Sequence, residues 1–424
     1  MILRPRRLVS SLLAVGGLVF ILAATLTPVP WRAASAAATP LLCLWCGEQG
    51  SVDVTLNVLL FIPFAFGLRL WGVAARRVVV ASLLLSLLVE SLQYAVVIGR
   101  DSSLSDVLTN TLGGALGAVL AGHLDALVRP CPQTARRLAI AWTAFWLGTT
   151  AVAALALRPW GPHGPLLTQW ARERPPHPPF DGRVTAASLG GAPLPEGWRP
   201  VEAEPPLALR AGTARLRVSV ITGNPAEAWR PILHLWREND EVLGFSQWGH
   251  ALVFESPSRA VPMRFRPVAV SLEHAFPTDS GVPLDLTAEV ERETIRLGSS
   301  WSGGRSRALT LSPSFGWSLV LPFDYALGPE VHLITALWLA GFLFPLGRWW
   351  GRAGLPPLTA IGLIAGVIVV GLGVLPRLAG YPPVHWSEWI ASAMGAALGW
   401  ARSGRAAYLS DRCDSPSIGA FSSS

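Results

Sequence analysis

"SDVLTNTLGGALG", residues 105–117, has the composition of a membrane helix but carries two polar side chains. Asp106 and Asn110 are four residues apart, so they share one face of a helix. Gly113 and Gly117 have the same spacing and form a ridge of small residues that lets another helix approach closely. Because a charge at the centre of a membrane helix costs about 2.5–3.5 kcal/mol, this face should look onto a polar site inside a helix bundle.

The composition of the whole chain supports a membrane protein. Of the 424 residues, 51% are hydrophobic and only 14% are charged, with a mean hydropathy of +0.42. That balance is too apolar for an ordinary soluble protein. All 34 basic residues are arginine, and they cluster in short stretches between apolar runs. Such clusters are typical of cytoplasmic loops, and they argue against nucleic acid as a partner.

Apolar runs of spanning length predict eight transmembrane helices. They lie at about 8–28, 54–70, 78–98, 105–127, 138–157, 331–347, 357–376 and 387–402. Arginine is enriched at every second boundary, for example near Arg76, Arg136 and Arg348, which predicts that both termini face the cytoplasm. We therefore expect a multi-pass protein of the inner (plasma) membrane. A cleaved signal peptide is the alternative for the first run, because "AASAAA" at 33–38 offers cleavage sites.

Residues 160–325 differ in character from the rest of the chain. In "ARLRVSV" the side chains of Leu216, Val218 and Val220 fall on one face, and further alternating stretches follow between turn-forming residues. Period-two runs at this spacing predict an antiparallel β-sandwich. The preceding span leads out of the cytoplasm, so this domain should be extracytoplasmic.

The predicted segments are a four-helix unit (1–130), a fifth helix (131–159), the sandwich (160–325), three more helices (326–404) and a cytoplasmic tail (405–424).

The opening stretch has a counterpart near the C-terminus. "SEWIASAMGAALG" at 387–399 aligns with it without gaps, and the same displacement aligns two prolines. The matched residues are Asp106 and Glu388, Asn110 and Ser392, Gly113 and Gly395, Gly117 and Gly399, and Pro63 and Pro345. We interpret this as two parallel four-helix units. Chance similarity between helix ends rich in small residues is the alternative.

Polar residues at helical spacing form a candidate binding site in the first unit. They are Asp53 and Asn57, Glu90 and Gln93, Arg100, and Asp106 and Asn110. All should lie toward the external side, and an intramembrane acid such as Glu90 is a functional candidate by default, with Arg100 as its expected partner. The alternative is structural, with Asp53 and Asp106 as helix-start residues and both asparagines as interhelical bonds.

The second unit has lost most of these polar residues. Leucine stands at the positions that match Asn57, Glu90 and Gln93, and threonine at the position of Asp53; these are Leu339, Leu372, Leu375 and Thr335. Only Glu388 keeps an acid. Any chemistry should therefore belong to the first unit, with the second as scaffold.

At these positions the chain resembles the VanZ-like membrane family. The resemblance covers about residues 8–128 and rests on the polar residues above together with Pro63, Gly113 and Gly117. It implies an integral membrane protein of the bacterial cell envelope, in a family named for an accessory role in glycopeptide (teicoplanin) resistance. It implies no established biochemical activity.

The external domain resembles a concanavalin A-like sandwich through "PILHLWREND", "GFSQWGHALVF" and "GWSLVLP". Gln247, Trp248 and His250 are its polar and aromatic candidates for carbohydrate binding, with a core or turn role as the alternative. Asn239 and Asp240 alone suggest a turn and not a calcium site. No metal-ligand cluster or nucleophile is evident, so we expect no cofactor.

Two cysteines, Cys43 and Cys46, form "CLWC" in the loop after the first run. A redox motif is one interpretation. A simple disulfide or an unremarkable loop is the other, favoured because no βαβ pattern surrounds the pair.

The preferred function from sequence is non-catalytic: recognition of an envelope glycan or lipid-linked precursor, with the lipid bilayer as the other partner. One alternative is a membrane-embedded enzyme that acts on a lipid headgroup through Glu90 and Asp106. Another is a transporter or lipid flippase that uses the polar site.

The arginine pattern makes a topology prediction. A cysteine introduced at Ser280 should react with an impermeant reagent in intact cells, and one in the tail at 405–424 should be protected. Labelling of the tail with protection of position 280 would contradict this topology.

Overall fold

The computed structural model describes residues 3–29, 42–45, 47, 49–162, 164–171, 177–197, 200–201, 209, 212–238 and 240–404. The predicted tail at 405–424, the "AASAAA" stretch, Cys46 and Asn239 lie outside these residues. Cys43 is disulfide-bonded. The chain divides into two compact units: one comprises Met1–Gly122, Ala151–Val331 and Ala379–Pro382, and the other comprises His123–Thr150, His332–Leu378 and Pro383–Ser424.

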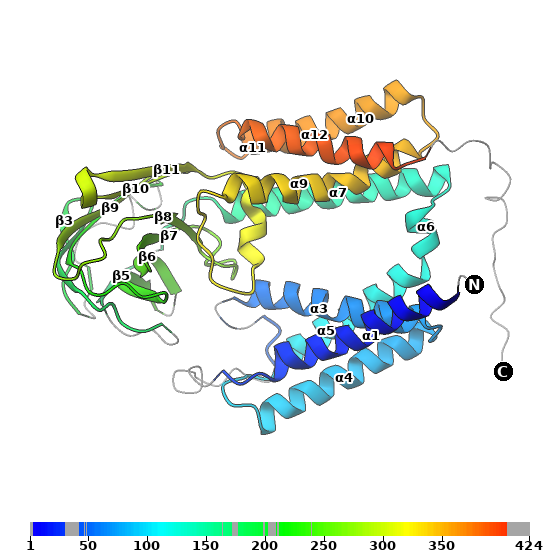
Figure 1. Ribbon diagram of the computed structural model, residues 1–424, viewed down its shortest axis with the longest axis horizontal. Helices are drawn as coiled ribbons and strands as arrows, with labels where there is room; N and C mark the ends of the chain where they lie inside the picture. Colours follow the sequence, from blue (N-terminus) through cyan, green and yellow to red (C-terminus); the bar gives the residue numbers. More distant parts are fainter. Residues whose placement is uncertain are drawn as a thin grey trace. The chain divides into compact units, whose positions relative to one another are not determined.

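Four long helices of the first unit form a bundle (Figure 1). They are α1 (Leu3–Leu26), α3 (Gly50–Leu70), α4 (Ala75–Ala95) and α5 (Leu104–Gly122). Each is long and apolar enough to cross a membrane. Ile21, Phe61, Phe64 and Val89 are buried between them. The helix predicted over 105–127 ends earlier than expected, since His123 interrupts it and a short helix, α6 (Leu124–Val128), follows.

α5 packs directly onto the backbone of α3. A Cβ atom added at Gly113 would overlap the carbonyl of Val58, and one added at Gly117 would lie 2.6 Å from the carbonyl oxygen of Ile62. Both distances are too short for a carbon atom, so only glycine permits this approach. The predicted ridge of small residues is confirmed.

The second unit contains the remaining helices. They are α7 (Pro132–Ala156), which runs into the first unit, α9 (Val331–Gly351), α10 (Pro357–Val369), the π-helical turn η3 (Val370–Val374), α11 (Leu375–Leu378) and α12 (Trp386–Ala401). The helical run of α10, η3 and α11 is continuous. The buried core of the second unit includes Trp146, Leu343, Leu346 and Leu372.

Among the described residues, seven helices are long and apolar enough to span a membrane. The eighth predicted span is present as α12 but has only 16 residues. At 1.5 Å per residue it is about 24 Å long, which falls short of a hydrocarbon core of about 30 Å. The sequence therefore predicted this helix correctly but overestimated its spanning capacity.

The helix contacts repeat along the chain. A Cβ atom at Gly395 would overlap the carbonyl of Ala340, and one at Gly399 would overlap that of Phe344. These residue pairs match the Gly113–Val58 and Gly117–Ile62 pairs when the sequence is shifted by one fixed number of residues, the same shift that aligns the repeat. The same displacement relates the first residues of α5 and α12, and those of α4 and α10. The α9–α12 contact thus reproduces the α3–α5 contact at both glycines.

The middle of the chain forms two antiparallel sheets, as predicted. One has the order β1-β5-β6-β7-β8, with β1 (Leu167–Trp170), β5 (Trp229–Arg237), β6 (Asp240–Trp248), β7 (Ala251–Ser256) and β8 (Val268–Leu272). The other has the order β11-β10-β9-β4-β2-β3, with β11 (Arg305–Thr310), β10 (Thr294–Ser299), β9 (Pro283–Glu291), β4 (Thr213–Ile221), β2 (Arg183–Leu189) and β3 (Ala192–Pro193). Leu216, Val218 and Val220 are buried along β4, which confirms the alternation.

The five-stranded sheet is buried on both faces. β7 and β8 are buried at every position, and β6 at all but its end residues. One face carries Phe245 and Phe254, whose rings lie 5.5 Å apart. Because side chains alternate along a strand, the opposite face carries His234, Gly244 and Glu255, which are cross-strand neighbours. Polar side chains are therefore enclosed on a face that a simple sandwich would leave to solvent.

The glycine ridge makes a stability prediction. Gly113→Ala should lower the free energy of unfolding by about 1–3 kcal/mol, because α5 and α3 must separate to admit the methyl group. Gly16→Ala in α1 is the matched control, since no atom lies within 4 Å of its added Cβ. There we expect no loss or a gain of up to about 1 kcal/mol. Thermal unfolding in detergent measures both, and equal effects would contradict the close contact.

Candidate functional site

The predicted site residues lie at one end of the four-helix bundle. Asp53 and Asn57 are near the start of α3, Asp106 and Asn110 near the start of α5, and Glu90 and Gln93 near the end of α4; Arg100 is in the loop between α4 and α5. Hydrogen bonds connect Asn57 to Asp106, and they connect Gln93 and Arg100 to the end of α1. We call this group the polar end.

Ser103 connects the Glu90 carboxylate to the backbone at the start of α5, next to Asp106. Its backbone N–H donates to Glu90 Oε2 (2.9 Å), and its hydroxyl accepts from the N–H of Asp106 (3.1 Å). Asp106 Oδ1 accepts a further bond from Asn57 Nδ2 (2.7 Å). Asn57, Asp106, Ser103 and Glu90 thus form a continuous chain of contacts across three elements.

Part of this arrangement stabilises the start of α5. Ser103 acts as the N-cap, since its hydroxyl bonds the N–H three residues later. In a capping box, the backbone N–H of the N-cap residue is bonded by an acidic side chain of the same helix. Here Glu90 supplies that acceptor from α4, with its carboxylate at the positive end of the α5 dipole.

Both asparagines form interhelical bonds, the structural role recognised as an alternative from sequence. Asn110 Nδ2 on α5 donates to Ser86 Oγ on α4 (3.0 Å). Asn57 joins α3 to α5 through Asp106. The polar end therefore holds three helices in register.

Gln93 and Arg100 bond the end of α1. Gln93 Nε2 donates to the carbonyl of Thr25 (2.9 Å), and Arg100 donates to those of Ala24 (2.8 Å) and Thr27 (3.2 Å). The last carbonyls of a helix have no intrahelical donor, so these bonds satisfy them. The sequence did not indicate this contact, and the predicted pairing of Arg100 with Glu90 stays a prediction.

The three carboxylates of the polar end differ in exposure. Asp53 is exposed and Asp106 is half-buried, whereas Glu90 is only 8% exposed. Acids from three helices therefore run from the surface to the interior. Such a series favours ligands that present hydrogen-bond donors or positive charge.

The second unit has a polar end at matching positions. Thr335, Glu388 and Ser392 are completely buried there. His385 matches Ser103 in the repeat and also caps its helix, accepting from the N–H of Ser387. Its ring stacks on that of His332, with centroids 4.3 Å apart. Neither histidine was predicted as a site residue from the sequence, although their positions at helix starts were a signal.

The model of the VanZ/LLP1 family matches residues 15–125. These residues form a VanZ-like domain. The match includes all seven residues predicted for the binding site. No curated protein and no solved structure matched the chain. The concanavalin A-like character of the sandwich stays a prediction.

The candidates chosen from sequence in the sandwich gather at a turn. Gln247 is 1% exposed and donates to the carbonyl of Gly249 (2.9 Å). His250 Nδ1 lies 3.3 Å from the carbonyl oxygen of Phe276. Trp248 is 46% exposed. Gln247 and His250 therefore hold the β6–β7 turn, and Trp248 is the accessible member of the three.

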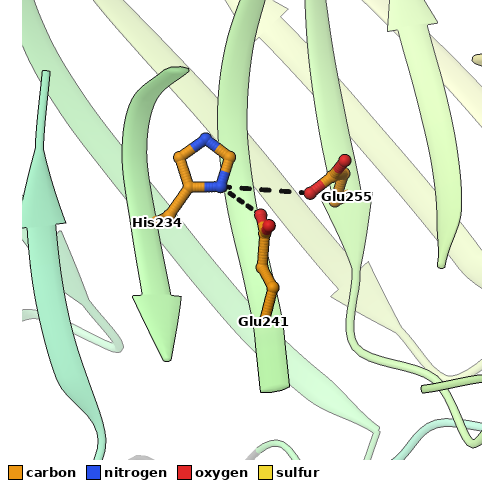
Figure 2. Close-up of side chains that lie close together, drawn as sticks. All are labelled: His234, Glu241 and Glu255. Carbon is orange, nitrogen blue, oxygen red and sulfur yellow. Dashed lines mark hydrogen bonds and ion pairs between the residues drawn. The ribbon is translucent and has the colours of Figure 1, made fainter. Parts of the chain in front are cut away.

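A second cluster of polar side chains lies in the sandwich, and the sequence did not predict it. His234 on β5, Glu241 on β6 and Glu255 on β7 point toward one another (Figure 2), and their ligand atoms all lie within 4.8 Å of each other. The three residues come from different strands and form no short motif. Only the register of the sheet brings them together.

The Ser103 contact makes a second stability prediction. Glu90→Gln keeps an oxygen that can accept from Ser103, so the free energy of unfolding should change little. Glu90→Leu leaves that N–H without its acceptor and should cost about 1–3 kcal/mol. Thermal unfolding in detergent compares the two. A leucine variant as stable as the glutamine variant would show that the bond is dispensable.

Proposed function

We propose that the VanZ-like domain binds the hydroxyl-rich headgroup of a lipid-linked envelope glycan or its precursor. The observation that supports this is the series of carboxylates Asp53, Asp106 and Glu90, which leads from an exposed to a buried position at one end of the bundle. The exposed position of Asp53 gives a headgroup access to the outer end of this series.

The side-chain chemistry suits a sugar better than a bare phosphate. Ionised carboxylates are acceptors only, and amides are donors and acceptors. Sugar hydroxyls can satisfy both kinds of group. Three acids repel an anion, so a phosphate would have to lie toward Arg100, which is at the same end of the bundle. A glycan attached to a lipid phosphate combines both features.

The position along the helices is also consistent with a headgroup ligand. Apart from Arg100 in the loop, the site residues lie near the ends of helices that are 19–21 residues long. Helices of this length end near the boundary between hydrocarbon and headgroups. The arginine pattern predicts that this end lies on the outer side of the inner membrane, where lipid-linked envelope precursors are used. Such binding offers a route to the glycopeptide resistance that the family resemblance implies.

The alternative function is acid–base catalysis on a lipid headgroup. The contact with Ser103 that joins Glu90 and Asp106 favours it, because two neighbouring carboxylates in different environments can serve as acid and base. Catalysis predicts that the headgroup is chemically changed, whereas recognition predicts that it is bound intact.

Lipid co-purification tests the proposal. The full chain in native lipid nanodiscs should retain glycan-bearing lipid, detected intact by mass spectrometry. Asp106→Asn and Glu90→Gln should reduce the retained amount about tenfold or more, since a hydrogen bond to a charged group contributes roughly 1.5–3 kcal/mol. Glycopeptide susceptibility of cells that express each variant gives a parallel measurement.

Glu388→Gln is the matched control, because Glu388 occupies the position of Asp106 in the repeat and is fully buried. It should retain the lipid at the wild-type level. Equal retention in all variants would refute headgroup binding at the polar end, and a cleaved headgroup would favour the enzyme.

A further inference from the structure

The side chains of His234, Glu241 and Glu255, here called the His/Glu cluster, are enclosed within the sandwich. In the two ion pairs that join them, the imidazole is 2% exposed and the carboxylates are 5% and 10% exposed. We propose that this cluster binds a divalent transition-metal ion, with Zn²⁺ as the best fit. The site is separate from the polar end and goes beyond the function proposed for it.

Strand register assembles the cluster. His234 on β5 and Glu255 on β7 are both paired with Gly244 on β6. Glu241 reaches the same place because the β5–β6 register shifts between Leu235 and Trp236. A bulge of this kind redirects a side chain. Without it, Glu241 would not share the face of the other two residues.

Gly244 leaves the central space open. A Cβ atom at this position would overlap His234 Nδ1 and lie 2.8 Å from Glu241 Oε1. Glycine in the middle of a strand weakens it and often marks the close approach of another group. The absence of a side chain at the strand centre thus gives the three donor groups room to converge.

The donor atoms are close to the separation that a metal requires. At metal–ligand distances of about 2.0–2.2 Å, donors in a tetrahedral site lie roughly 3.4 Å apart. His234 Nδ1 is 3.9 Å from Glu255 Oε2 and in direct contact with Glu241 Oε1. Small side-chain rotations would bring all three donors to one ion.

The remaining ring nitrogen of His234 has the partner that a ligating histidine usually has. Nε2 lies 3.2 Å from Ser246 Oγ. A metal-bound histidine donates its other N–H to a nearby acceptor, which fixes the tautomer. A bond from Nε2 to Ser246 leaves the lone pair on Nδ1, the nitrogen that faces both carboxylates.

A cavity adjoins the cluster. Glu241 and Glu255 form part of its lining, with His177, Arg266, Asp324 and Tyr325 among the other lining residues. Zinc sites with three protein ligands keep a fourth position for water or a ligand. The cavity provides a place for that fourth ligand.

Charge and donor type favour a transition metal. Two carboxylates share one imidazole, and a divalent cation would compensate both negative charges in this dry environment. Carboxylate oxygens alone suit Ca²⁺ or Mg²⁺, whereas imidazole suits zinc and its neighbours. The competing explanation is an ion pair between His234 and Glu241 that needs no metal.

Metal analysis of the full chain in detergent distinguishes the two. After treatment with a chelator and dialysis against micromolar Zn²⁺, we expect one zinc per chain and a rise in the unfolding temperature of about 5 °C or more at saturation. Glu255→Gln, which preserves size, should lose at least tenfold in zinc affinity and show no thermal response. Ser246→Ala should weaken zinc binding about tenfold.

His250→Gln and Glu273→Gln are controls that remove one histidine and one acid of the same domain outside the cluster. Both should bind zinc like the parent protein. Unchanged zinc binding in Glu255→Gln and Ser246→Ala, or no zinc in the parent chain, would overturn the proposal in favour of the ion pair. Stronger binding of Ca²⁺ than of Zn²⁺ would overturn the choice of metal. If Glu255→Gln fails to fold, Ser246→Ala decides alone.

Discussion

The contact between α3 and α5 determines where the polar residues of the VanZ-like domain lie. Lipid provides no hydrophobic drive for helices to associate, so close packing must hold them together. Gly113 and Gly117 let α5 rest on the carbonyls of Val58 and Ile62. With the backbones at that distance, Asn57 on α3 reaches Asp106 on α5. A larger residue in the ridge would separate the helices and break this bond.

The same glycine contact recurs between α9 and α12 with different polar residues around it. Gly395 and Gly399 reproduce the packing, and His385 replaces Ser103 as the cap. The exposed Asp53 and the half-buried Asp106 distinguish the first polar end, whereas Glu388 is completely buried. One packing solution thus accommodates two sets of side chains, which makes the second set a natural control for the first.

A structural role and the proposed binding role coincide at Ser103. Glu90 satisfies the first N–H of α5, and that bond also holds its carboxylate in position. A binding site needs side chains whose orientation is set before the ligand arrives. At the polar end, helix capping provides that orientation. The His/Glu cluster obtains the same result from a bulge and a central glycine in a sheet.

The sequence alone was sufficient for the apolar helices, the sandwich, the repeat and the grouping of the predicted polar residues at one end of the bundle. The repeat rests on aligned residues, and the others rest on local pattern: i, i+4 spacing for Asp106 and Asn110, and alternation for Leu216 and Val218. The short reach of α12 was already visible in the sequence, because the predicted run at 387–402 is no longer than the helix. The partners of the polar side chains could not be predicted. Ser103 joins Glu90, Arg100 bonds α1, and His234 meets Glu241 and Glu255 only through backbone geometry that packing and strand register decide. Local pattern shows which face of an element is polar, but the partner comes from a distant part of the chain, and only the tertiary structure brings it close.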